Sequence, residues 1–598
     1  MAVMRPQLTG TFGAVASTHW LASAVGMNIL DRGGNAFDAV AAAGFALQLV
    51  EPHSNGPGGD VVISVYPRST GTVRVICGQG PMPRAATVDR FAALGLKQMP
   101  ASGLLPATVP GAFGAWMRLL AEFGTLPLAD VLEPAIGYAS HGYPLLPAAA
   151  STIAAMAALF ETEWTASGRT YLPGGAVPAT GSRMRNTTLG ATYERLIREA
   201  QAASTDREAQ FEAAHAAFYQ GFVAESIDRF VRTEVVDSTG GRNRGLLTGE
   251  DLAAWRPSVE EPHVLSYGDY TVHKPGPWSQ GPVFLQQLSI LAGCDLRGMG
   301  LNSVEYIHTL AEVAKLAFAD REAYYGDPTQ TPVPMTELLN PEYAALRRSL
   351  IGDGAALDPQ PGRVGTERPW IPQAEPDQPA ADEPDWLTQL RSGLPTVTVP
   401  RAGAGNTCTV AVADRWGNLA VAVPSGGWLK SSPVIGDLGF ALGTRGQTAW
   451  LTEGHPNSLA PARRPRTTLS PSIVLRQGEP FLAFGTPGGD QQDQWTLQAF
   501  LAIAEFGLEP QAATELPAWN IDHFAQSFAP RLSRPGVVVA EQSLGADVLA
   551  GLEKKGHLLD VVPESTLGKV CAAGVDPDTG FLRAATGPRG RQAHAACR

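Results

Sequence analysis

The sequence has few charged residues and no long apolar run. Asp, Glu, Lys and Arg make up 17% of its 598 residues, whereas hydrophobic residues make up 44%. Disordered chains show the opposite balance, with much charge and little hydrophobicity. No uninterrupted apolar stretch approaches the roughly 20 residues of a membrane span, and residues 1–10 lack the apolar core of a secretory signal. We therefore expect a globular protein in the cytoplasm, with no membrane partner.

An excess of positive charge is also missing. The formal net charge is -12, from 45 Lys and Arg against 57 Asp and Glu. A nucleic-acid surface needs a basic patch, so nucleic acid is not expected as a partner. The five cysteines are scattered and odd in number, which fits reduced thiols better than disulfides and offers no metal-site spacing. They are Cys77, Cys294, Cys408, Cys571 and Cys597.

Several familiar catalytic signatures are absent as well. The sequence contains neither G-x-S-x-G nor H-E-x-x-H, which weighs against a serine hydrolase of that type and against a zinc protease. The glycine-rich loop at residues 51–59 lacks a Gly-Lys-Ser/Thr ending and is not a phosphate cradle. We interpret its glycines as close backbone packing, in preference to substrate contact. No metal and no cofactor are expected.

Helical spacing dominates the first two thirds of the chain. The apolar positions Leu21, Val25 and Ile29 predict a helix that starts near residue 17 and ends at Gly33–Gly34, and further helices are predicted over 36–49 and 304–325. Between 353 and 404, Pro, Asp, Glu and Gly accumulate, which indicates an exposed, mobile segment.

Strand patterns dominate the last third. Alternating β-branched runs predict strands at 407–413, 419–423, 472–475 and 481–484, and an earlier strand is predicted at 61–66. Helices followed by a strand-rich end indicate an α+β protein in which helices cover antiparallel sheets. We expect one large catalytic unit, since length alone is a soft guide to domain number.

The segment Gly405-Asn-Thr-Cys-Thr409 stands at the start of the first of these late strands. A threonine hydroxyl is a poor nucleophile unless a base takes its proton. The threonine's own α-amino group, with an ordinary pKa of about 7.7 to 8.0, can be that base. The amine exists only after the Asn406–Thr407 bond breaks. Taken alone, such a segment more often merely opens a β-hairpin. Cys408 is interpreted as a small buried packing residue.

A set of ordered motifs decides between these interpretations. They are ASTHWLAS at 16–23, GGNAFDA at 33–39, VEPHS at 50–54, VPG at 109–111, FGTLP at 123–127, KLAFADR at 315–321, RPRTTLSP at 464–471 and GTPGG at 485–489. Over nearly its whole length the chain resembles the γ-glutamyltranspeptidase family of N-terminal-nucleophile hydrolases. The resemblance implies a four-layer αββα sandwich, with two antiparallel sheets between helical layers.

The resemblance also implies a processed enzyme. Cleavage of Asn406–Thr407 by the protein itself would give subunits 1–406 and 407–598, which together form one catalytic unit as a heterodimer or a dimer of heterodimers. Thr407 would be the nucleophile and its freed amine the general base. Ser425 stands where the family keeps a second threonine that supports the nucleophile; a surface hydroxyl in a turn is the alternative.

The resemblance assigns four further positions around the substrate. Gly488 and Gly489 stand where the family places its oxyanion hole, although a T-P-G-G loop is often merely a turn. Thr467 and Thr468 take the place of paired serines that bind the substrate carboxylate.

Two departures from the family bear on the substrate. Gln79 stands where the family has an arginine that grips the α-carboxylate of a glutamyl group, so a charge-assisted bidentate contact is lost. No Asp or Glu occurs in 443–448, near the family's acidic residue for the amino group. Arg445 offers a replacement positive charge, or else is a solvated loop arginine.

The expected substrate is therefore a small amide that is not an ordinary γ-glutamyl donor, either an oxamate-like compound or a bulkier acyl amide of the cephalosporin-acylase kind. A true γ-glutamyl hydrolase or transferase, using Arg84 or Arg445, is the first alternative. A non-catalytic relative that keeps the sandwich as a binding scaffold is the second.

Overall fold

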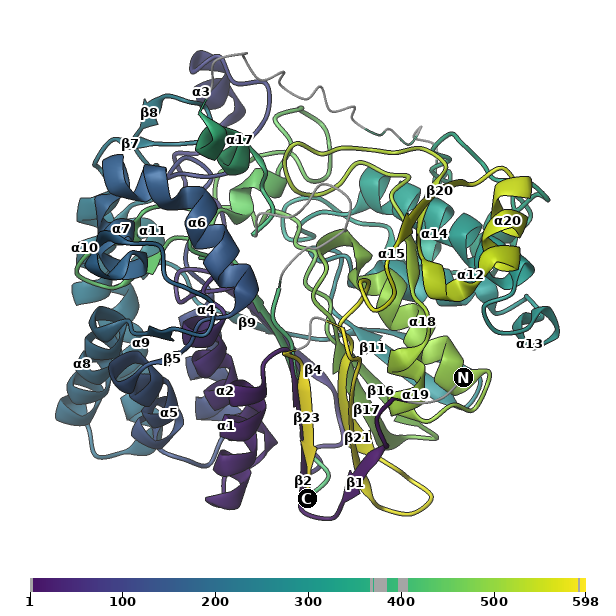
Figure 1. Cartoon of the computed structure of the whole chain (residues 1–598), viewed down its shortest axis with the longest axis horizontal. Coiled ribbons are helices and arrows are strands. Elements are labelled where there is room, and N and C mark those ends of the chain that lie inside the picture. The colour runs from purple at the N-terminus through teal and green to yellow at the C-terminus, as the bar shows by residue number, and fades with distance from the viewer. Residues whose placement is uncertain (1–3, 366–368, 370, 372–383, 396–406, 590–591) are drawn as a thin grey trace.

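Four layers make up the molecule, with two β-sheets face to face and helices on both outer faces (Figure 1). This computed structural model describes residues 4–365, 369, 371, 384–395, 407–589 and 592–598. Both large sheets have seven strands, and every strand pairing within them is antiparallel. The expected α+β sandwich is confirmed.

The first sheet, called here the β12 sheet, contains the strand that follows Thr407. In spatial order its strands are β23 (His594–Cys597), β2 (Gly13–Ser17), β12 (Val410–Asp414), β13 (Leu419–Ser425), β3 (Asp60–Tyr66), β4 (Arg74–Gly78) and β9 (Ser258–Glu260).

The second sheet, the β17 sheet, faces it. Its order is β1 (Leu8–Gly10), β22 (Leu582–Thr586), β21 (Cys571–Val575), β17 (Glu479–Gly485), β16 (Ser472–Arg476), β11 (Tyr270–Lys274) and β10 (His263–Tyr267).

One helical layer covers the β12 sheet, and the other covers the β17 sheet (Figure 1). The first layer holds α1 (Trp20–Asp31), α2 (Ala36–Val50), α4 (Ala112–Phe123), α5 (Leu128–His141), α6 (Pro147–Thr162), α7 (Thr165–Tyr171), α8 (Thr187–Ala203), α9 (Arg207–Tyr219), α10 (Phe222–Val231) and α11 (Gly249–Ala253). The second holds α12 (Gly281–Leu291), α13 (Leu296–Met299), α14 (Val304–Tyr324), α15 (Met335–Leu338), α16 (Pro341–Arg348), α18 (Gln492–Ala504), α19 (Pro510–Glu515) and α20 (Ala546–Lys554).

Smaller elements complete the fold. A three-stranded sheet is formed by β18 (Trp519–Ile521), β19 (Val537–Glu541) and β20 (Leu558–Val562), and the short pairs are β5 (Tyr143–Pro144) with β6 (Arg183–Met184), β7 (Val235–Val236) with β8 (Arg242–Asn243) and β14 (Val434–Ile435) with β15 (Phe440–Ala441). Single elements are α3 (Val88–Ala93), α17 (Asp385–Arg391), and the 3-10 turns η1 (Pro173–Gly175), η2 (Arg445–Thr448), η3 (Gly489–Gln491) and η4 (Gln542–Leu544).

The first two helices follow from their end signals. Gly33 adopts φ +92, a left-handed conformation that glycine tolerates and that ends α1. Asn35 and Asp38 then form a capping box that starts α2. Every residue of α2 is buried, so it is the central helix under the β12 sheet. The first helix begins at Trp20 and not near residue 17, because residues 13–17 form β2.

The strand predictions agree with the structure except at two places. The predicted strand 407–413 begins only at Val410, because its neighbour β2 ends at Ser17, where the chain turns into α1. The stretch 258–274, within a region expected to be largely helical, forms β9, β10 and β11. Of the segment 353–404, the described part contains α17, and the remainder lies outside the described residues.

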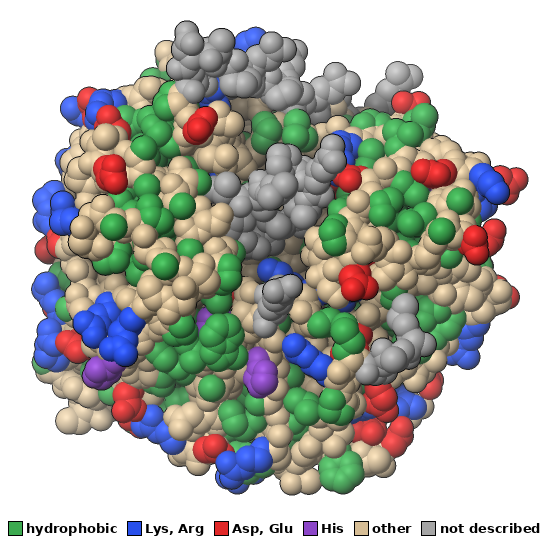
Figure 2. Space-filling view, viewed as in Figure 1, with side chains coloured by type: hydrophobic (Ala, Val, Ile, Leu, Met, Phe, Trp, Pro, Cys, Tyr) green, Lys and Arg blue, Asp and Glu red, His purple; other side chains and the backbone are tan. Residues whose placement is uncertain are grey.

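The two sheets interleave strands from both sides of residue 407. Strand β12 lies between β2 and β13, and β16 lies between β11 and β17. An apolar core fills the space between the sheets, and a larger core lies under each helical layer. No helix in the described ranges has the length and apolar character needed to cross a membrane. On the face shown in Figure 2, charges of both signs are scattered among other side chains.

Candidate active site

The register of the β12 sheet aligns four predicted or newly found site residues. Cys408 N donates to Pro424 O at 3.0 Å, so the pairing of β12 with β13 continues one step to Thr407 and Ser425. Their hydroxyl oxygens, Thr407 Oγ1 and Ser425 Oγ, lie 3.4 Å apart. Ser425 in turn pairs with Asp60 on β3.

The row extends one strand further. Val61 pairs with Gly78 on β4, so Asp60 faces the next residue, Gln79. Directly opposed residues of antiparallel strands place their side chains on one face. Thr407, Ser425, Asp60 and Gln79 therefore form a cross-strand row at one end of the sheet.

This row faces the space between the two sheets. Side chains alternate along a strand, and Cys408 packs on the opposite side, in the core beneath α2. A Cβ added to Gly485, the last residue of β17, would lie 3.2 Å from the Thr409 side chain. The loop after β17 and the loop before β16 therefore reach the same end of the sandwich, and they carry Gly488, Gly489, Thr467 and Thr468.

Both hydroxyls at the centre of the row are shielded from solvent. Thr407 is 6% exposed and Ser425 is 1% exposed. Of the two interpretations of Ser425, a surface turn hydroxyl does not match this burial. Asn406, the other half of the expected cleavage site, lies outside the described residues.

The Gly488–Gly489 loop has a backbone that only glycine adopts easily. The φ angles are +135 and +56, and a Cβ on Gly488 would lie 2.3 Å from the Trp495 ring. Gln280 Nε2 donates to Gly489 O at 3.2 Å. The next residue, Asp490, accepts hydrogen bonds from Arg321 and Ser527. Buried hydrogen bonds therefore hold the Gly488–Gly489 loop in place.

Three of the predicted substrate-binding residues keep a buried polar atom without a partner among the described residues. These atoms are Gln79 Oε1, Thr468 Oγ1 and Arg445 Nη1. Gln79 Nε2 is bound to Pro465 O, and Thr467 Oγ1 accepts from Leu469 N at 3.3 Å. Buried polar atoms are rarely left unpaired in folded proteins. These three atoms are available to pair with a polar ligand.

Arg445 is buried and already paired. Its Nε and Nη2 donate to the two carboxylate oxygens of Asp60 at 2.8 and 2.9 Å. The Phe528 ring lies 5.5 Å from its guanidinium carbon. Arg445 is therefore not a solvated loop residue, and its charge is balanced. Arg84, the other arginine considered for a carboxylate, is exposed.

Sequence reasoning missed Asp60. An acidic residue was expected near 443–448, whereas the structure places Asp60, from the start of β3 almost 400 residues earlier in the chain, beside Arg445. A buried aspartate directly after two glycines was the available signal. Those glycines do pack closely, because a Cβ at Gly58 or Gly59 would lie 2.1 or 2.2 Å from a backbone oxygen.

Cys408 is held as a neutral thiol. Burial, together with the neighbouring Glu51 carboxylate, raises the pKa of the Cys408 thiol well above its usual value. The thiolate is the nucleophilic form of cysteine, so Cys408 is not a competing nucleophile.

One buried cluster has metal-ligand residue types. The ligand atoms of His308, Glu312 and His557 lie within 4.8 Å of one another. However, Lys315 Nζ lies 2.6 Å from Glu312 Oε1, and His308 Nδ1 is hydrogen-bonded to His557 Nε2 at 2.9 Å. A divalent cation would have to displace or adjoin this ammonium group, so we assign no metal to the cluster.

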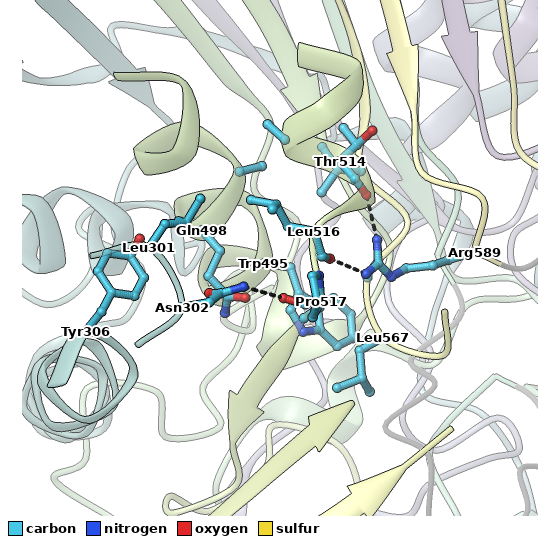
Figure 3. Close-up of a pocket in the computed structure, with 15 residues that line it drawn as sticks. Leu301, Asn302, Tyr306, Trp495, Gln498, Thr514, Leu516, Pro517, Leu567 and Arg589 are labelled. Atoms are coloured by element: carbon cyan, nitrogen blue, oxygen red, sulfur yellow. Dashed lines mark hydrogen bonds between the residues drawn. The ribbon is translucent and has the colours of Figure 1, made fainter. Parts of the chain in front are cut away.

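The cavity in Figure 3 is lined by none of the predicted site residues, although its lining includes Trp495, which packs against Gly488. It lies between α18, the start of α14 and the loop that carries Arg589. Arg589 and Asn302 bind backbone oxygens beside it.

Comparisons with known proteins agree with this architecture. The family model described as gamma-glutamyltranspeptidase matches residues 22–597. The glutathione hydrolase-like YwrD proenzyme of Bacillus subtilis is 31% identical, over 98% of this chain and 99% of that protein. The solved structure of LmbA2991HD is 49% identical with a TM-score of 0.92, and covers 100% of both chains. Cephalosporin acylase from Bacillus halodurans is 30% identical with a TM-score of 0.82, over 100% of this chain and 98% of that one.

The fold and the match together define an amidohydrolase of the N-terminal-nucleophile class. The chain belongs to the γ-glutamyltranspeptidase family. The resemblance seen in the sequence is confirmed, and the non-catalytic scaffold alternative is set aside.

Proposed function

We propose that this protein is a self-processing threonine amidohydrolase that acts through an acyl-enzyme on a small amide. The observation that carries the proposal is the buried pairing of the Thr407 and Ser425 hydroxyls at 3.4 Å. They lie between the two sheets, at the end where the glycine loop after β17 arrives.

Each group then has a chemical role. The α-amine of Thr407, released by cleavage of Asn406–Thr407, takes the proton from Oγ1 as that oxygen attacks the amide carbon. Backbone N–H groups of Gly488 and Gly489 stabilise the oxyanion. The ammonium then gives its proton to the leaving amine, which leaves an ester on Oγ1. Water, activated by the same amine, releases the acid. An acceptor amine in place of water would give transfer.

Ser425 supports this chemistry as a neighbour of the attacking oxygen. Its hydroxyl is able to donate a hydrogen bond to Thr407 Oγ1, which orients the lone pairs and stabilises the developing alkoxide. Asp60, the carboxylate of the row, accepts hydrogen bonds from Arg445.

The charge balance of the row supports an acyl donor that is not an ordinary γ-glutamyl amide. Gln79 is neutral, and the Arg445 charge is matched by Asp60. The unpaired atoms Gln79 Oε1, Thr468 Oγ1 and Arg445 Nη1 offer one acceptor and donors for a polar acyl group. Such a set suits an oxamate-like amide or a larger acyl amide, and the similarity to a cephalosporin acylase supports the larger one.

A γ-glutamyl hydrolase or transferase is the second candidate. A buried Asp60–Arg445 pair contains one group for an ammonium and one for a carboxylate, which are the two ends of an amino acid. Binding a γ-glutamyl donor would require the pair to separate and each partner to find a new counter-ion. The similarity to a glutathione hydrolase-like protein supports this candidate.

Cleavage would divide the chain into subunits 1–406 and 407–598 that stay together. Both large sheets combine strands from the two pieces, so separation would break both sheets. We therefore propose a heterodimer that behaves as one catalytic unit.

A substrate panel tests the choice of acyl donor. The purified, cleaved enzyme is offered γ-glutamyl-p-nitroanilide, oxamate, and glutaryl and phenylacetyl p-nitroanilides. We expect one of the last three to have a kcat/KM at least about tenfold higher than the first, a difference of about 1.4 kcal/mol in transition-state binding. If γ-glutamyl-p-nitroanilide is the best substrate, the second candidate replaces the first.

A further inference from the structure

A buried carboxylate lies directly behind the proposed nucleophile. Glu51 ends α2 and is 2% exposed. Its Oε2 accepts hydrogen bonds from Cys408 Sγ and from Thr18 Oγ1, both at 2.8 Å, and its Oε1 accepts from Gln592 Nε2 at 3.2 Å. Glu51 therefore contacts the side chain of the residue that follows Thr407 in the chain.

These contacts fix the backbone on which Thr407 stands. Cys408 also accepts from Asn55 Nδ2 at 3.0 Å, so its sulfur is held from two sides. The carboxylate links the thiol to Thr18, and the backbone of Thr18 in turn donates to Thr409 O at 3.1 Å. The stretch 407–409 is thus held by side chains from α2 and its following loop, just where the regular strand pairing has ended.

Among the described residues, the side chains near Glu51 that can carry a positive charge are the histidines His19 and His53. In the described part of the chain, no Lys or Arg forms an ion pair with it. The titratable groups that face it are His19, His53 and Cys408, with Lys569 and Cys571 farther away on the side of β21. Burial lowers the pKa of both histidines to about 4, against the attraction of Glu51. Although burial alone would raise it, the pKa of Glu51 is held below its usual value by these histidines and by hydrogen bonds from Cys408 and Thr18.

We propose that Glu51 is a positioning residue for Thr407 and the negative charge that stabilises the α-ammonium group formed when the chain is cleaved. The inference rests on the proposed function, since it requires Thr407 to become a free N-terminus. A buried charge without an ion pair to Lys or Arg is costly, and an ammonium group at Thr407 would supply positive charge on the same stretch of backbone. The carboxylate on the other face of the sheet, Asp60, already forms an ion pair with Arg445.

The size of the effect follows from the covalent geometry. From Thr407 N to Cys408 Sγ is at most about 7.5 Å through standard bonds, and the sulfur lies 2.8 Å from Glu51. The amine and the carboxylate are therefore no more than about 10 Å apart. At an effective dielectric constant of about 20, a unit charge at that distance shifts a pKa by about one unit.

The test is the pH dependence of kcat/KM in matched variants. The acid limb reports deprotonation of the Thr407 amine in the free enzyme. Because Glu51→Gln removes a negative charge, the ammonium loses stabilisation, and the acid limb should move to lower pH by about one unit. Thr18→Val removes a hydrogen bond to the same carboxylate but keeps its charge, so its acid limb should stay at the wild-type pH. The electrostatic role is overturned if the acid limb of Glu51→Gln stays at the wild-type pH. It is also overturned if the acid limb of Thr18→Val shifts as far as that of Glu51→Gln.

The positioning role is tested at Cys408. Cys408→Ser keeps a donor to Glu51, whereas Cys408→Val has a similar size and no donor. We expect Cys408→Val to slow self-cleavage and turnover at least tenfold more than Cys408→Ser, with the acid limb unmoved in both. Equal rates in the two Cys408 variants overturn the positioning role. This comparison tests the positioning role even if Glu51→Gln does not fold. A different result would show that the proposed function itself is wrong. In that case the wild-type chain stays whole, or the Thr407→Ala chain is cleaved.

Discussion

The Asp60–Arg445 pair makes a prediction that joins stability to substrate choice. Both side chains are almost fully buried, at 4% and 2% exposure, and two hydrogen bonds of 2.8 and 2.9 Å join them. In Asp60→Asn the carboxylate charge is lost while the shape is kept. The Arg445 charge is then left buried without a counter-ion.

The expected loss of stability is large for one isosteric substitution. Removing one partner of a buried ion pair costs about 3 to 5 kcal/mol, and replacing both partners by apolar groups is often close to neutral. We expect the Asp60→Asn value near the lower end, since the amide still accepts one hydrogen bond. The double variant Asp60→Asn with Arg445→Met should recover most of the loss.

The stability assay is urea unfolding in a Thr407→Ala background, which we expect to remain a single chain. A double-mutant cycle over Asp60 and Arg445 then gives their coupling energy. Additive effects, with a coupling energy near zero, would refute the conclusion that Arg445 is neutralised by Asp60.

The same substitution should change the substrate preference in the cleavable protein. A freed guanidinium can bind a substrate carboxylate with a charged hydrogen bond of about 1.5 to 3 kcal/mol. We expect kcat/KM for γ-glutamyl-p-nitroanilide to rise at least about tenfold relative to a neutral acyl anilide. An unchanged ratio would mean that Arg445 does not reach the acyl group.

Three further predictions concern single groups of the site. Ser425→Ala should lower kcat about fivefold with little change in KM, because the lost hydrogen bond of about 1 kcal/mol acts on the attacking oxygen; a raised KM at full kcat would assign Ser425 to substrate binding instead. Gly488→Ala should lower kcat about 10²-fold or more, since a Cβ would meet the Trp495 ring at 2.3 Å and the N–H group would turn away; full activity would remove this loop from the oxyanion hole. Cys408 should resist iodoacetamide at pH 8 in the folded protein, because burial and Glu51 raise the pKa of its thiol; rapid labelling, located by peptide mass spectrometry, would contradict that environment.

Local sequence signals predicted much of the fold. The Gly33–Asn35 signal separated α1 from α2 because a left-handed glycine and a capping box act over a few residues. Strands β13, β16 and β17 were predicted from their alternation. Strands β9 to β11 were not predicted, since short, half-exposed strands carry a weak pattern and are defined by their neighbours in the sheets.

The site was predictable in part for the same reason. Thr407, Gly488 and Gly489 stand in motifs that can be read along the chain. The partnership of Asp60 with Arg445 joins positions 385 residues apart, and the contact of Glu51 with Cys408 joins positions 357 apart. Such contacts depend on the register of β3 and on the packing of α2, which no local pattern encodes. Among the described residues, Asp60 and Glu51 were therefore found only from the structure.

The most direct test of the central claim is an intact mass spectrum of the purified protein under denaturing conditions, with Thr407→Ala measured beside it. The account predicts that the wild-type 63.0 kDa chain appears as two pieces, the smaller beginning at Thr407, and that Thr407→Ala remains whole. A whole wild-type chain that is nevertheless active, or a cleaved Thr407→Ala chain, would contradict the assignment of Thr407 as the self-released nucleophile.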